Sequence, residues 1–318
     1  MNFAAPPVAT AAVAATATTA AAETATFERS LLDQVTVVVV TYNSAHCVPA
    51  LATGLQDVPH LVVVDNASND GCLAAVAAAL PQANRLALPH NRGYGVANNE
   101  GLARVATPYA LLLNPDCEIS ASQIAALVQA AHTWPDAAAI APQLVDGAGR
   151  KQVNYSWPRD AWQPRTAGAS GPLTVGYACA AVLLLNLARL ASIGHFDPRF
   201  FLYYEDEDLC LRIHHARRAI VVVPQIEVVH LSRGSVRGQR PWRAEYWRGY
   251  HHVQSKVRFI AKHAGPAAGV QALRRLRMVS ALHLLARALV PSPKHLARTW
   301  GRCQGVWQMR LEPDCLSC

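Results

Sequence analysis

The sequence lacks long apolar runs and is poor in aromatic residues. No segment of the 318 residues reaches the roughly 20 apolar residues that cross a bilayer, and the longest apolar run, Val175–Leu185, ends at Asn186. Aromatic residues make up 7% of the chain, and no basic region precedes the Ala/Thr-rich N-terminal stretch. We therefore expect neither a membrane-spanning nor a fibrous protein, nor a signal peptide. The 52% of hydrophobic residues suffice for one large globular domain with an appendage.

Cysteine is present but lacks the spacing of a disulfide framework. Cys315 and Cys318 form a C-x-x-C without a second pair or a histidine at ligand spacing, so neither zinc binding nor lipidation is favoured there. Five other cysteines lie in apolar or motif contexts that are typical of reduced thiols in a cytosolic protein: Cys47, Cys72, Cys117, Cys179 and Cys210. We therefore expect a cytoplasmic location.

Charge is divided unevenly between the two parts of the chain. Residues 1–232 hold 13 basic and 18 acidic residues, a net charge of −5, whereas residues 233–318 hold 16 basic and three acidic residues, a net charge of +13. Such a division predicts that the C-terminal part meets an anionic surface, either a membrane leaflet or a nucleic acid. The alternative is a solvated basic helical tail.

The hydrophobic pattern predicts an α/β domain between two different flanking segments. Residues 1–30 are rich in Ala and Thr and lack periodic large apolar residues, so we expect disorder there. From Val35 onward, apolar β-branched runs alternate with helical segments, which predicts a sheet with helices on both faces. The expected strands are Val35–Val40, Leu61–Val64, Arg85–Leu88 and Tyr109–Leu113, and the expected helices are Cys47–Gln56, Leu73–Leu80 and Val96–Val105.

The second half of the chain has a different pattern. Val175–Leu185 is expected to be a strand or buried segment, and beyond Arg233 the chain becomes helical, basic and rich in Trp. Between them we expect helices over Leu187–Ile193 and Asp206–Arg217, and short strands over Ile220–Val223 and Glu227–Val229.

Polar residues follow three of the expected strands. They are Thr41-Tyr42-Asn43, Asp65-Asn66 and Asn114-Pro115-Asp116. Ligands of open parallel sheets bind just past the carboxyl ends of the strands, so the three clusters are expected to converge on one crevice. Asp65 can accept hydrogen bonds from a base or a ribose there, and Asp116 is placed to hold Mg²⁺ or Mn²⁺ beside a diphosphate.

A glycine-containing loop, Asn91–Asn99, opens the third expected helix. Gly93 and Gly95 allow the backbone to approach a ligand closely, and Arg92 can meet a phosphate. The loop has no G-x-G-x-x-G after a strand, which disfavours a nicotinamide cofactor.

Four consecutive acids, Glu205-Asp206-Glu207-Asp208, follow an aromatic run. Mutual repulsion makes such a run costly, so some of these acids need partners or a function. A carboxylate that faces the crevice can deprotonate an acceptor hydroxyl. A helix start alone explains one or two of them. His230, after an apolar strand, is a candidate to complete the metal site.

These motifs, in this order, resemble glycosyltransferase family 2, and within it the rhamnosyltransferase-like bacterial branch. The resemblance covers about residues 35–235. Its elements are Val40-Thr41-Tyr42-Asn43, Val64-Asp65-Asn66-Ala67-Ser68, Asn91-Arg92-Gly93-Tyr94-Gly95 with Asn98-Asn99, Leu113-Asn114-Pro115-Asp116, the run Phe200–Arg212, and His230. The resemblance implies a GT-A fold with a mixed, mainly parallel sheet flanked by helices, and a nucleotide-sugar donor with Mg²⁺ or Mn²⁺.

The resemblance also implies roles for individual residues. Asp116 matches the last position of the family's D-x-D-type element, and Asn114 stands where other members carry the first Asp. His230 matches a metal-binding histidine, and Asp206 matches the catalytic base. Acceptor contacts fall to Glu205 and Tyr204, and donor contacts to Thr41, Tyr42, Asn43, Asp65, Asn66, Arg92, Gly93, Asn98 and Asn114.

The expected enzyme inverts configuration and moves a hexose, with rhamnose from dTDP-rhamnose favoured, onto a glycan or lipid-linked acceptor such as those of O-antigen. Mannosyl, glucosyl or galactofuranosyl transfer stays open. Residues 31–235 would form the catalytic domain, and residues 236–318 a basic helical region at the inner face of the cell membrane. A non-catalytic nucleotide-binding protein is the alternative of another class, and a nucleic-acid partner is not expected.

Overall fold

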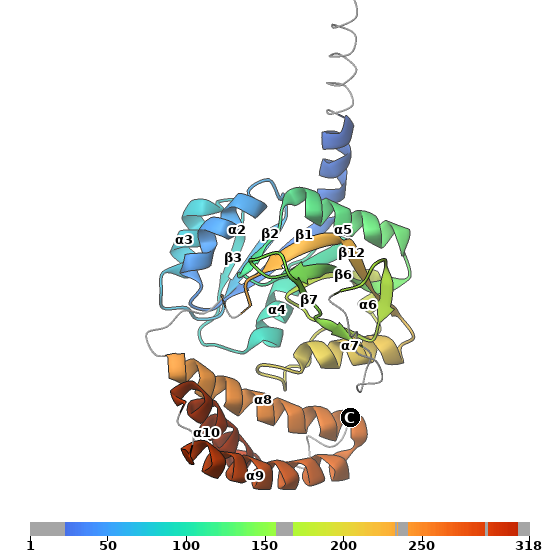
Figure 1. Ribbon diagram of the computed structural model, residues 1–318. Coiled ribbons are helices and arrows are strands. Elements are labelled where there is room, and N and C mark those ends of the chain that lie inside the picture. The colour runs from blue at the N-terminus through green and yellow to red at the C-terminus, as the bar shows by residue number, and fades with distance from the viewer. Residues whose placement is uncertain (1–22, 157–167, 233, 235–240, 290–291, 311–318) are drawn as a thin grey trace, which may run out of the picture.

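The computed structural model describes residues 23–156, 168–232, 234, 241–289 and 292–310 (Figure 1). The strands are β1 (Val35–Thr41), β2 (Leu61–Asp65), β3 (Asn84–Ala87), β4 (Tyr109–Leu113), β5 (Cys117–Glu118), β6 (Ala137–Val145), β7 (Lys151–Gln152), β8 (Tyr155–Ser156), β9 (Leu173–Val175), β10 (Tyr177–Ala178), β11 (Val182–Asn186) and β12 (Ala219–His230). The helices are η1 (Ala45–Cys47), α2 (Val48–Leu55), α3 (Cys72–Ala79), α4 (Tyr94–Leu102), α5 (Ala121–Thr133), α6 (Leu187–Leu190), α7 (Glu205–His215), α8 (Pro241–Ala264), α9 (Pro266–Leu289) and α10 (Pro293–Gln308).

A mixed sheet forms the centre of the molecule. Its strand order is β3-β2-β1-β4-β11-β6-β12-β5, with β7 paired to β6 and β9 paired to β12. The strands from β3 to β4 run parallel, β11 runs antiparallel to both of its neighbours, and β12 runs parallel to β6. Helices cover both faces (Figure 1). The prediction of a mixed sheet flanked by helices is therefore confirmed.

Strand β1 shows why the sequence reads as a continuous apolar run. All seven of its residues are buried. Val37 and Val39 belong to the core cluster that includes α2, α3 and α5, whereas Val38 and Val40 belong to the cluster that includes α4 and α7. Successive side chains of a strand point to opposite faces. A strand that is covered on both faces thus needs apolar residues at every position.

Three sequence expectations differ from the structure. Residues 23–32 form a helix, so the prediction of disorder over 1–30 is wrong for residues 23–30. Leu31 and Leu32, only 3% and 5% exposed, fix the end of this helix in the core; residues 1–22 lie outside the described residues. Val175–Leu185 divides among three strands. Ile220–Val223 and Glu227–Val229 are one strand, β12, whose register against β6 shifts between Val223 and Glu227.

The C-terminal part forms a layer of three helices below the sheet domain, with α8 next to α7 (Figure 1). Gly265, at φ +93°, separates α8 from α9, and Pro266 begins α9. A left-handed glycine followed by a proline is a strong helix boundary. The helices share a small core of five buried residues: Val253, Val257, Leu273, Val306 and Met309. Among the described helices, none combines the length and the apolarity that crossing a membrane requires.

An ion cluster joins this layer to the sheet domain. Asp208 of α7 is fully buried, and its carboxylate lies 2.6 Å from Lys262 Nζ and 2.8 Å from His263 Nε2, both on α8. Lys262 Nζ also lies 2.7 Å from Asp197 Oδ2. Arg212 Nε donates to Asp208 Oδ2 at 2.9 Å. These contacts lower the pKa of Asp208 although burial alone would raise it, so the carboxylate is charged and fixes α8 against α7.

Candidate functional site

The loops after β1 and β2 are held together by polar side chains. Thr41 Oγ1 donates to Asp65 Oδ1 at 3.0 Å, and Asp65 Oδ2 accepts from the Ser68 backbone N–H at 3.0 Å. Asn43 has φ 52°, and its Oδ1 accepts from the Asn69 backbone N–H at 2.9 Å. Thr41 and Asp65 are buried. The structure thus brings these three expected donor-binding residues together, and their hydrogen bonds shape the loops.

Asn66 holds the glycine-containing loop in place. Its Nδ2 donates to Asn91 Oδ1 at 3.0 Å and to the Gly93 carbonyl at 3.2 Å, and its Oδ1 accepts from the Arg92 backbone N–H at 2.9 Å. The Asn66 side chain is 3% exposed. Its amide is occupied by the loop, so Asn66 connects the end of β2 to the start of α4.

Gly93 is needed for contact between two loops. Its φ is +85°, and a Cβ at this position would lie 2.2 Å from the Phe201 carbonyl oxygen. The next residue, Tyr94, donates its backbone N–H to the same carbonyl at 3.0 Å. A side chain at Gly93 would therefore separate the loop before α4 from the aromatic segment that precedes α7.

The remaining expected donor-binding residues, Arg92, Asn98 and Tyr42, differ in how far their side chains are exposed. Arg92 is 40% exposed at its side chain and forms a 2.6 Å ion pair with Glu100, on the next turns of α4. Asn98 is 1% exposed and donates to the Tyr94 carbonyl at 3.0 Å. Tyr42 is 37% exposed. Of these, Arg92 and Tyr42 present side chains to solvent, whereas Asn98 is part of the helix interior.

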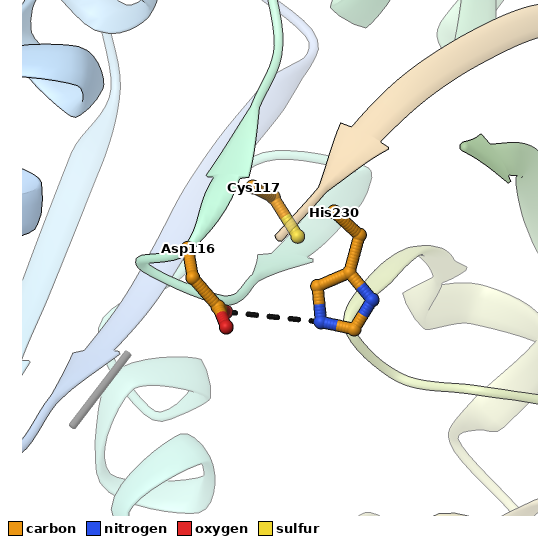
Figure 2. A group of neighbouring side chains, drawn as sticks. All are labelled: Asp116, Cys117 and His230. Atoms are coloured by element: carbon orange, nitrogen blue, oxygen red, sulfur yellow. Dashed lines mark ion pairs between the residues drawn. The ribbon is translucent and has the colours of Figure 1, made fainter. Parts of the chain in front are cut away.

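The expected metal ligands lie close together just after the end of β4. Asp116 follows β4, His230 ends β12, and β5 pairs with β12 so that Cys117 lies opposite His230. One ligand atom from each of the three lies within 4.8 Å of the others. His230 Nε2 is 3.8 Å from Asp116 Oδ1 (Figure 2). Burial lowers the pKa of His230 while Asp116 opposes this, so the imidazole is neutral and able to bind a metal.

One backbone segment borders this cluster, and an unpartnered amide lies two residues before Asp116 in the chain. Gly234 donates its backbone N–H to Asp116 Oδ2 at 2.9 Å, and its carbonyl lies 2.6 Å from His46 Nε2. Asn114 Oδ1 is buried without a hydrogen-bond partner among the described residues. A buried amide oxygen without a partner is costly, and a cation or a ligand donor at this point would satisfy it. The carboxylate of Asp116 and the imidazole of His230 are donors that fit Mg²⁺ or Mn²⁺.

The acidic run at the start of α7 contains two carboxyl groups with different surroundings. Asp206 Oδ2 accepts from Tyr177 OH at 3.0 Å, and Oδ1 accepts from the Glu207 backbone N–H at 2.9 Å. Burial raises the pKa of Asp206, and Tyr177 opposes the shift. Glu205 is 6% exposed, and its Oε2 has no hydrogen-bond partner among the described residues. Burial, followed by the charge of Asp206, raises the pKa of Glu205 well above its ordinary value. Asp206 is thus the better stabilised anion of the pair.

One short segment, Tyr177–Ala181, contacts both the loop of Asp116 and the acidic run. The Ala181 carbonyl accepts from the Asn114 backbone N–H at 2.8 Å and from Cys117 Sγ at 3.6 Å. Tyr177, three residues before Ala180, donates its hydroxyl to the Asp206 carboxylate at 3.0 Å. The structure therefore connects the loop of Asp116 and the carboxylate of Asp206 through the same short segment.

Tyr204 and Tyr203 turn the chain into α7 and contact α8. Both have left-handed backbones, at φ 67° and 68°, which costs free energy in residues other than glycine. Their rings lie 5.6 and 5.4 Å from the His252 ring. Tyr204, expected at the acceptor, is thus held between the acidic run and the C-terminal helices.

Sequence reasoning missed several members of these networks. Ser68 is given no role in the sequence analysis, yet its Oγ accepts from the Asn43 backbone N–H at 2.8 Å. Tyr177 sits within an apolar segment that carries no signal for a carboxylate partner. Cys117 was assigned only as a reduced thiol, although its place directly after Asp116 was a usable signal.

The order of the strands in the mixed sheet and the helices on both of its faces are those of the GT-A fold. A mannosyltransferase from Pyrobaculum calidifontis, solved in complex with GDP-Man and Mn2+, has the same fold, with a TM-score of 0.53, 17% identity, and coverage of 87% of this chain and 88% of that one.

Residues 36–186 match the family model described as Glycosyl transferase family 2. The chain is similar to N-acetylglucosaminyl-diphospho-decaprenol L-rhamnosyltransferase of Mycobacterium tuberculosis, 27% identical over 74% of this chain and 87% of the relative. It is also similar to the low-salt glycan biosynthesis hexosyltransferase Agl10 of Haloferax volcanii, 24% identical over 74% of this chain and 78% of the relative.

Proposed function

We propose that the chain is an inverting, metal-dependent glycosyltransferase that moves L-rhamnose from dTDP-rhamnose to a hydroxyl of a lipid-linked glycan in surface polysaccharide synthesis. The name of the mycobacterial relative supports both rhamnose and a diphospho-decaprenol-linked acceptor. The name of Agl10 supports hexosyl transfer in glycan biosynthesis. The contacts of the segment Tyr177–Ala181 with both Asn114 and Asp206 are the observation that carries the proposal, because transfer needs a leaving-group site and a base close together.

In this proposal Asp116 and His230 hold Mg²⁺ or Mn²⁺, with Asn114 Oδ1 next to them. A bound divalent ion neutralises the charge that develops on the departing nucleoside diphosphate. Thr41, Asn43 and Asp65 shape the pocket for the nucleoside, and Arg92 steadies the diphosphate by exchanging Glu100 for a phosphate oxygen. The structural role of Asn66, Gly93 and Asn98 is to fix the loops of that pocket.

Asp206 acts as the general base. Its carboxylate takes the proton of the acceptor hydroxyl while that oxygen attacks the anomeric carbon opposite the leaving group, so configuration inverts in one displacement. A pKa raised by burial makes Asp206 a stronger base than an exposed aspartate. Glu205 lies beside it with a pKa that burial raises well above its ordinary value, and its unsatisfied Oε2 can hydrogen-bond to the acceptor. The adjacent Tyr204 lines the same approach.

The basic helical region is proposed to contact the cytoplasmic leaflet. Residues 233–318 carry a net charge of +13, and anionic lipids attract basic segments at the membrane surface. Residues 31–235 serve as the catalytic domain in this arrangement. A lipid-linked acceptor would then reach the acidic run from the side on which α8 contacts Tyr204.

A panel of nucleotide sugars tests the proposal. The purified chain is heated with Mn²⁺ and, in separate samples, dTDP-rhamnose, GDP-mannose, UDP-glucose or UDP-galactofuranose. A ligand that binds only the folded state raises the apparent Tm, so dTDP-rhamnose should give the largest increase, and EDTA should remove it. Release of dTDP on adding a prenyl-diphosphate-linked sugar then reports transfer. Stabilisation by another donor would replace rhamnose, and stabilisation by none would contradict the proposal.

A further inference from the structure

The three C-terminal helices enclose a cavity next to the acidic run. Its volume is about 210 Å³, far above the roughly 10–15 Å³ that one water needs. The lining comes from all three helices: His252, Val253 and Lys256 of α8, Leu276, Val279, Ser280 and His283 of α9, and Thr299 and Arg302 of α10. The wall is thus apolar in part, with hydroxyl and cationic groups set into it.

The charged groups of the lining are all of one sign. Lys256, Arg302 and two histidines line the cavity, and no acid does. Within the described residues Arg302 forms no ion pair, and its Nε is buried without a hydrogen-bond partner. Burial, followed by Arg302, Arg298 and Lys256, lowers the pKa of His252 to about 4. Lys256 and Arg302 are half-buried, and partly desolvated cations that repel each other are stabilised by a bound anion.

The cavity is adjacent to the candidate active site. His252, which lines the cavity, contacts the rings of Tyr203 and Tyr204, and Tyr204 directly precedes Glu205. Ser255, one residue before Lys256, donates its hydroxyl to the Leu202 carbonyl at 2.9 Å. A ligand in the cavity would therefore lie directly behind the turn that carries the acidic run.

The surroundings favour a ligand with an apolar chain. Large hydrophobic side chains are exposed on the same helices: Met278, Leu282 and Leu285 on α9, and Leu296, Trp300 and Trp307 on α10. Their spacing of three to four residues on α9 places them along one side of the helix. Such side chains suit the interface of a membrane, where an anionic headgroup and an apolar chain occur together.

We propose that this cavity binds the diphosphate of a lipid-linked acceptor, with Lys256 and Arg302 as its principal contacts. The inference rests on the proposed glycosyl transfer and adds to it a second anion site, separate from the nucleotide crevice at the strand ends. Bidentate donation by an arginine and a point charge from a lysine are the usual recognition elements for phosphate groups. The site would hold the headgroup while the acceptor sugar extends past Tyr204 toward Asp206.

Calorimetric titration with farnesyl diphosphate, farnesol and dTDP tests the site on the full chain. We expect farnesyl diphosphate to bind at least about tenfold tighter than farnesol, a difference of about 1.4 kcal/mol. Replacing both cations, Lys256→Gln with Arg302→Gln, should remove this preference. The charge-preserving pair Lys256→Arg with Arg302→Lys should keep it. A matched control, Arg274→Gln with Arg275→Gln, removes two exposed charges of α9 outside the lining and should change binding less than twofold.

The outcomes separate this site from the proposed reaction. Equal losses in the cavity variant and in the control would show general charge attraction and overturn the site. Displacement of farnesyl diphosphate by dTDP would place it in the nucleotide crevice, and absence of farnesyl diphosphate binding would also overturn the inference. Donor stabilisation and dTDP release in the wild-type chain are measured independently, so failure of the site leaves those results standing. Circular dichroism and Tm confirm that each variant is folded.

Discussion

The sheet domain and the C-terminal helices differ in where they place their apolar side chains and in the sign of their net charge. The sheet domain carries its apolar residues inside, with β1 buried at every position. The helices share a core of five buried residues, and eight of the eleven exposed large hydrophobic side chains among the described residues lie between Trp242 and Trp307. Net charge divides in the same way, at −5 for residues 1–232 and +13 for residues 233–318. The sheet domain therefore buries its apolar residues around the candidate site, whereas the C-terminal helices expose a basic and apolar surface.

The difference teaches where each part obtains its stability. The sheet domain depends on apolar burial, the dominant favourable contribution to folding. The helices add to their small core an attachment through charge, because Lys262 and His263 contact the buried carboxylate of Asp208. Substitutions in the candidate active site, in the ion cluster around Asp208 and on the exposed helical surface should therefore have separable effects.

The largest effect is expected from Asp206→Asn, which breaks the chemistry and spares both parts of the fold. A general base contributes about 10²–10⁴-fold, so kcat/KM should fall by that factor while donor stabilisation persists. In the wild type, kcat/KM should fall as pH decreases through the pKa of Asp206, which burial raises, because only the deprotonated form accepts a proton. Glu118→Gln, at an exposed acid of β5, is the control. Near-normal turnover by Asp206→Asn would contradict the assignment of Asp206 as the general base.

Lys262→Met should loosen the two parts from each other. It leaves the buried carboxylate of Asp208 and the half-buried carboxylate of Asp197 without their shared cation, and breaking a buried pair costs about 3–5 kcal/mol. Urea unfolding should show a loss at the lower end of this range, because Lys262 is 19% exposed, against little change for the exposed Lys294→Met. An unchanged free energy of unfolding would refute the role of the cluster.

The same variant has a predictable pH dependence. The pKa of Asp208 is lowered in the folded state, so its contribution to stability is present above the pKa of the unfolded chain. The contribution is lost as pH falls through the folded pKa. Without Lys262 the pKa is depressed less, so the variant should lose less stability between neutral and acidic pH than the wild type does. A steeper loss would contradict this sign.

Asp116→Asn tests the metal site within the sheet domain. Even outer-shell changes cost about 10–100-fold in metal affinity, so we expect at least the upper value for Mn²⁺, measured by electron paramagnetic resonance. Cys117→Ser should change Mn²⁺ affinity little, because this ion prefers oxygen and nitrogen ligands. A loss in Cys117→Ser equal to that in Asp116→Asn would instead make the thiol a ligand.

The smallest effect is expected for the helical surface. The triple replacement Met278→Gln, Leu282→Gln and Leu285→Gln should reduce co-sedimentation with anionic liposomes roughly threefold to tenfold. Leu231→Gln alters an exposed leucine of the sheet domain and should not. Each replacement is at an exposed position, so the free energy of unfolding should stay within about 0.5 kcal/mol per site. Unaffected liposome binding would remove this surface from the proposal.

Strands were the most predictable part of the molecule. Tyr109–Leu113 was predicted with its observed bounds because both faces of this strand are buried and turn residues follow it. The continuity of β12 was not predictable in the same way. Pro224 lies where the register of β12 shifts, and a proline in an apolar run indicates a break when pairing partners are unknown.

The sequence predicts which residues belong to the candidate site, but it does not predict which contacts those residues make. Asp116 and His230 were paired from their places after strands, and the structure puts them 3.8 Å apart. The amide of Asn66 and the glycine at position 93 both serve loop packing, which depends on partners 25 to more than 100 residues away. Contacts between residues so far apart in the sequence produce no local pattern from which they could be predicted. The roles of the site residues in transfer stay predictions.

The dipeptide Ala180–Ala181 has a consequence for how the enzyme can vary. The Ala181 carbonyl accepts from the Asn114 backbone N–H, and Tyr177, three residues before Ala180, donates to Asp206, so the main chain of this segment links the loop of Asp116 to the proposed base. Ala180 and Ala181 are each 2% exposed, and a larger side chain at either position would have to push its surroundings apart. In the proposed reaction, donor preference can change through the loops around the crevice, whereas the span that the sugar must cross is set by main-chain atoms.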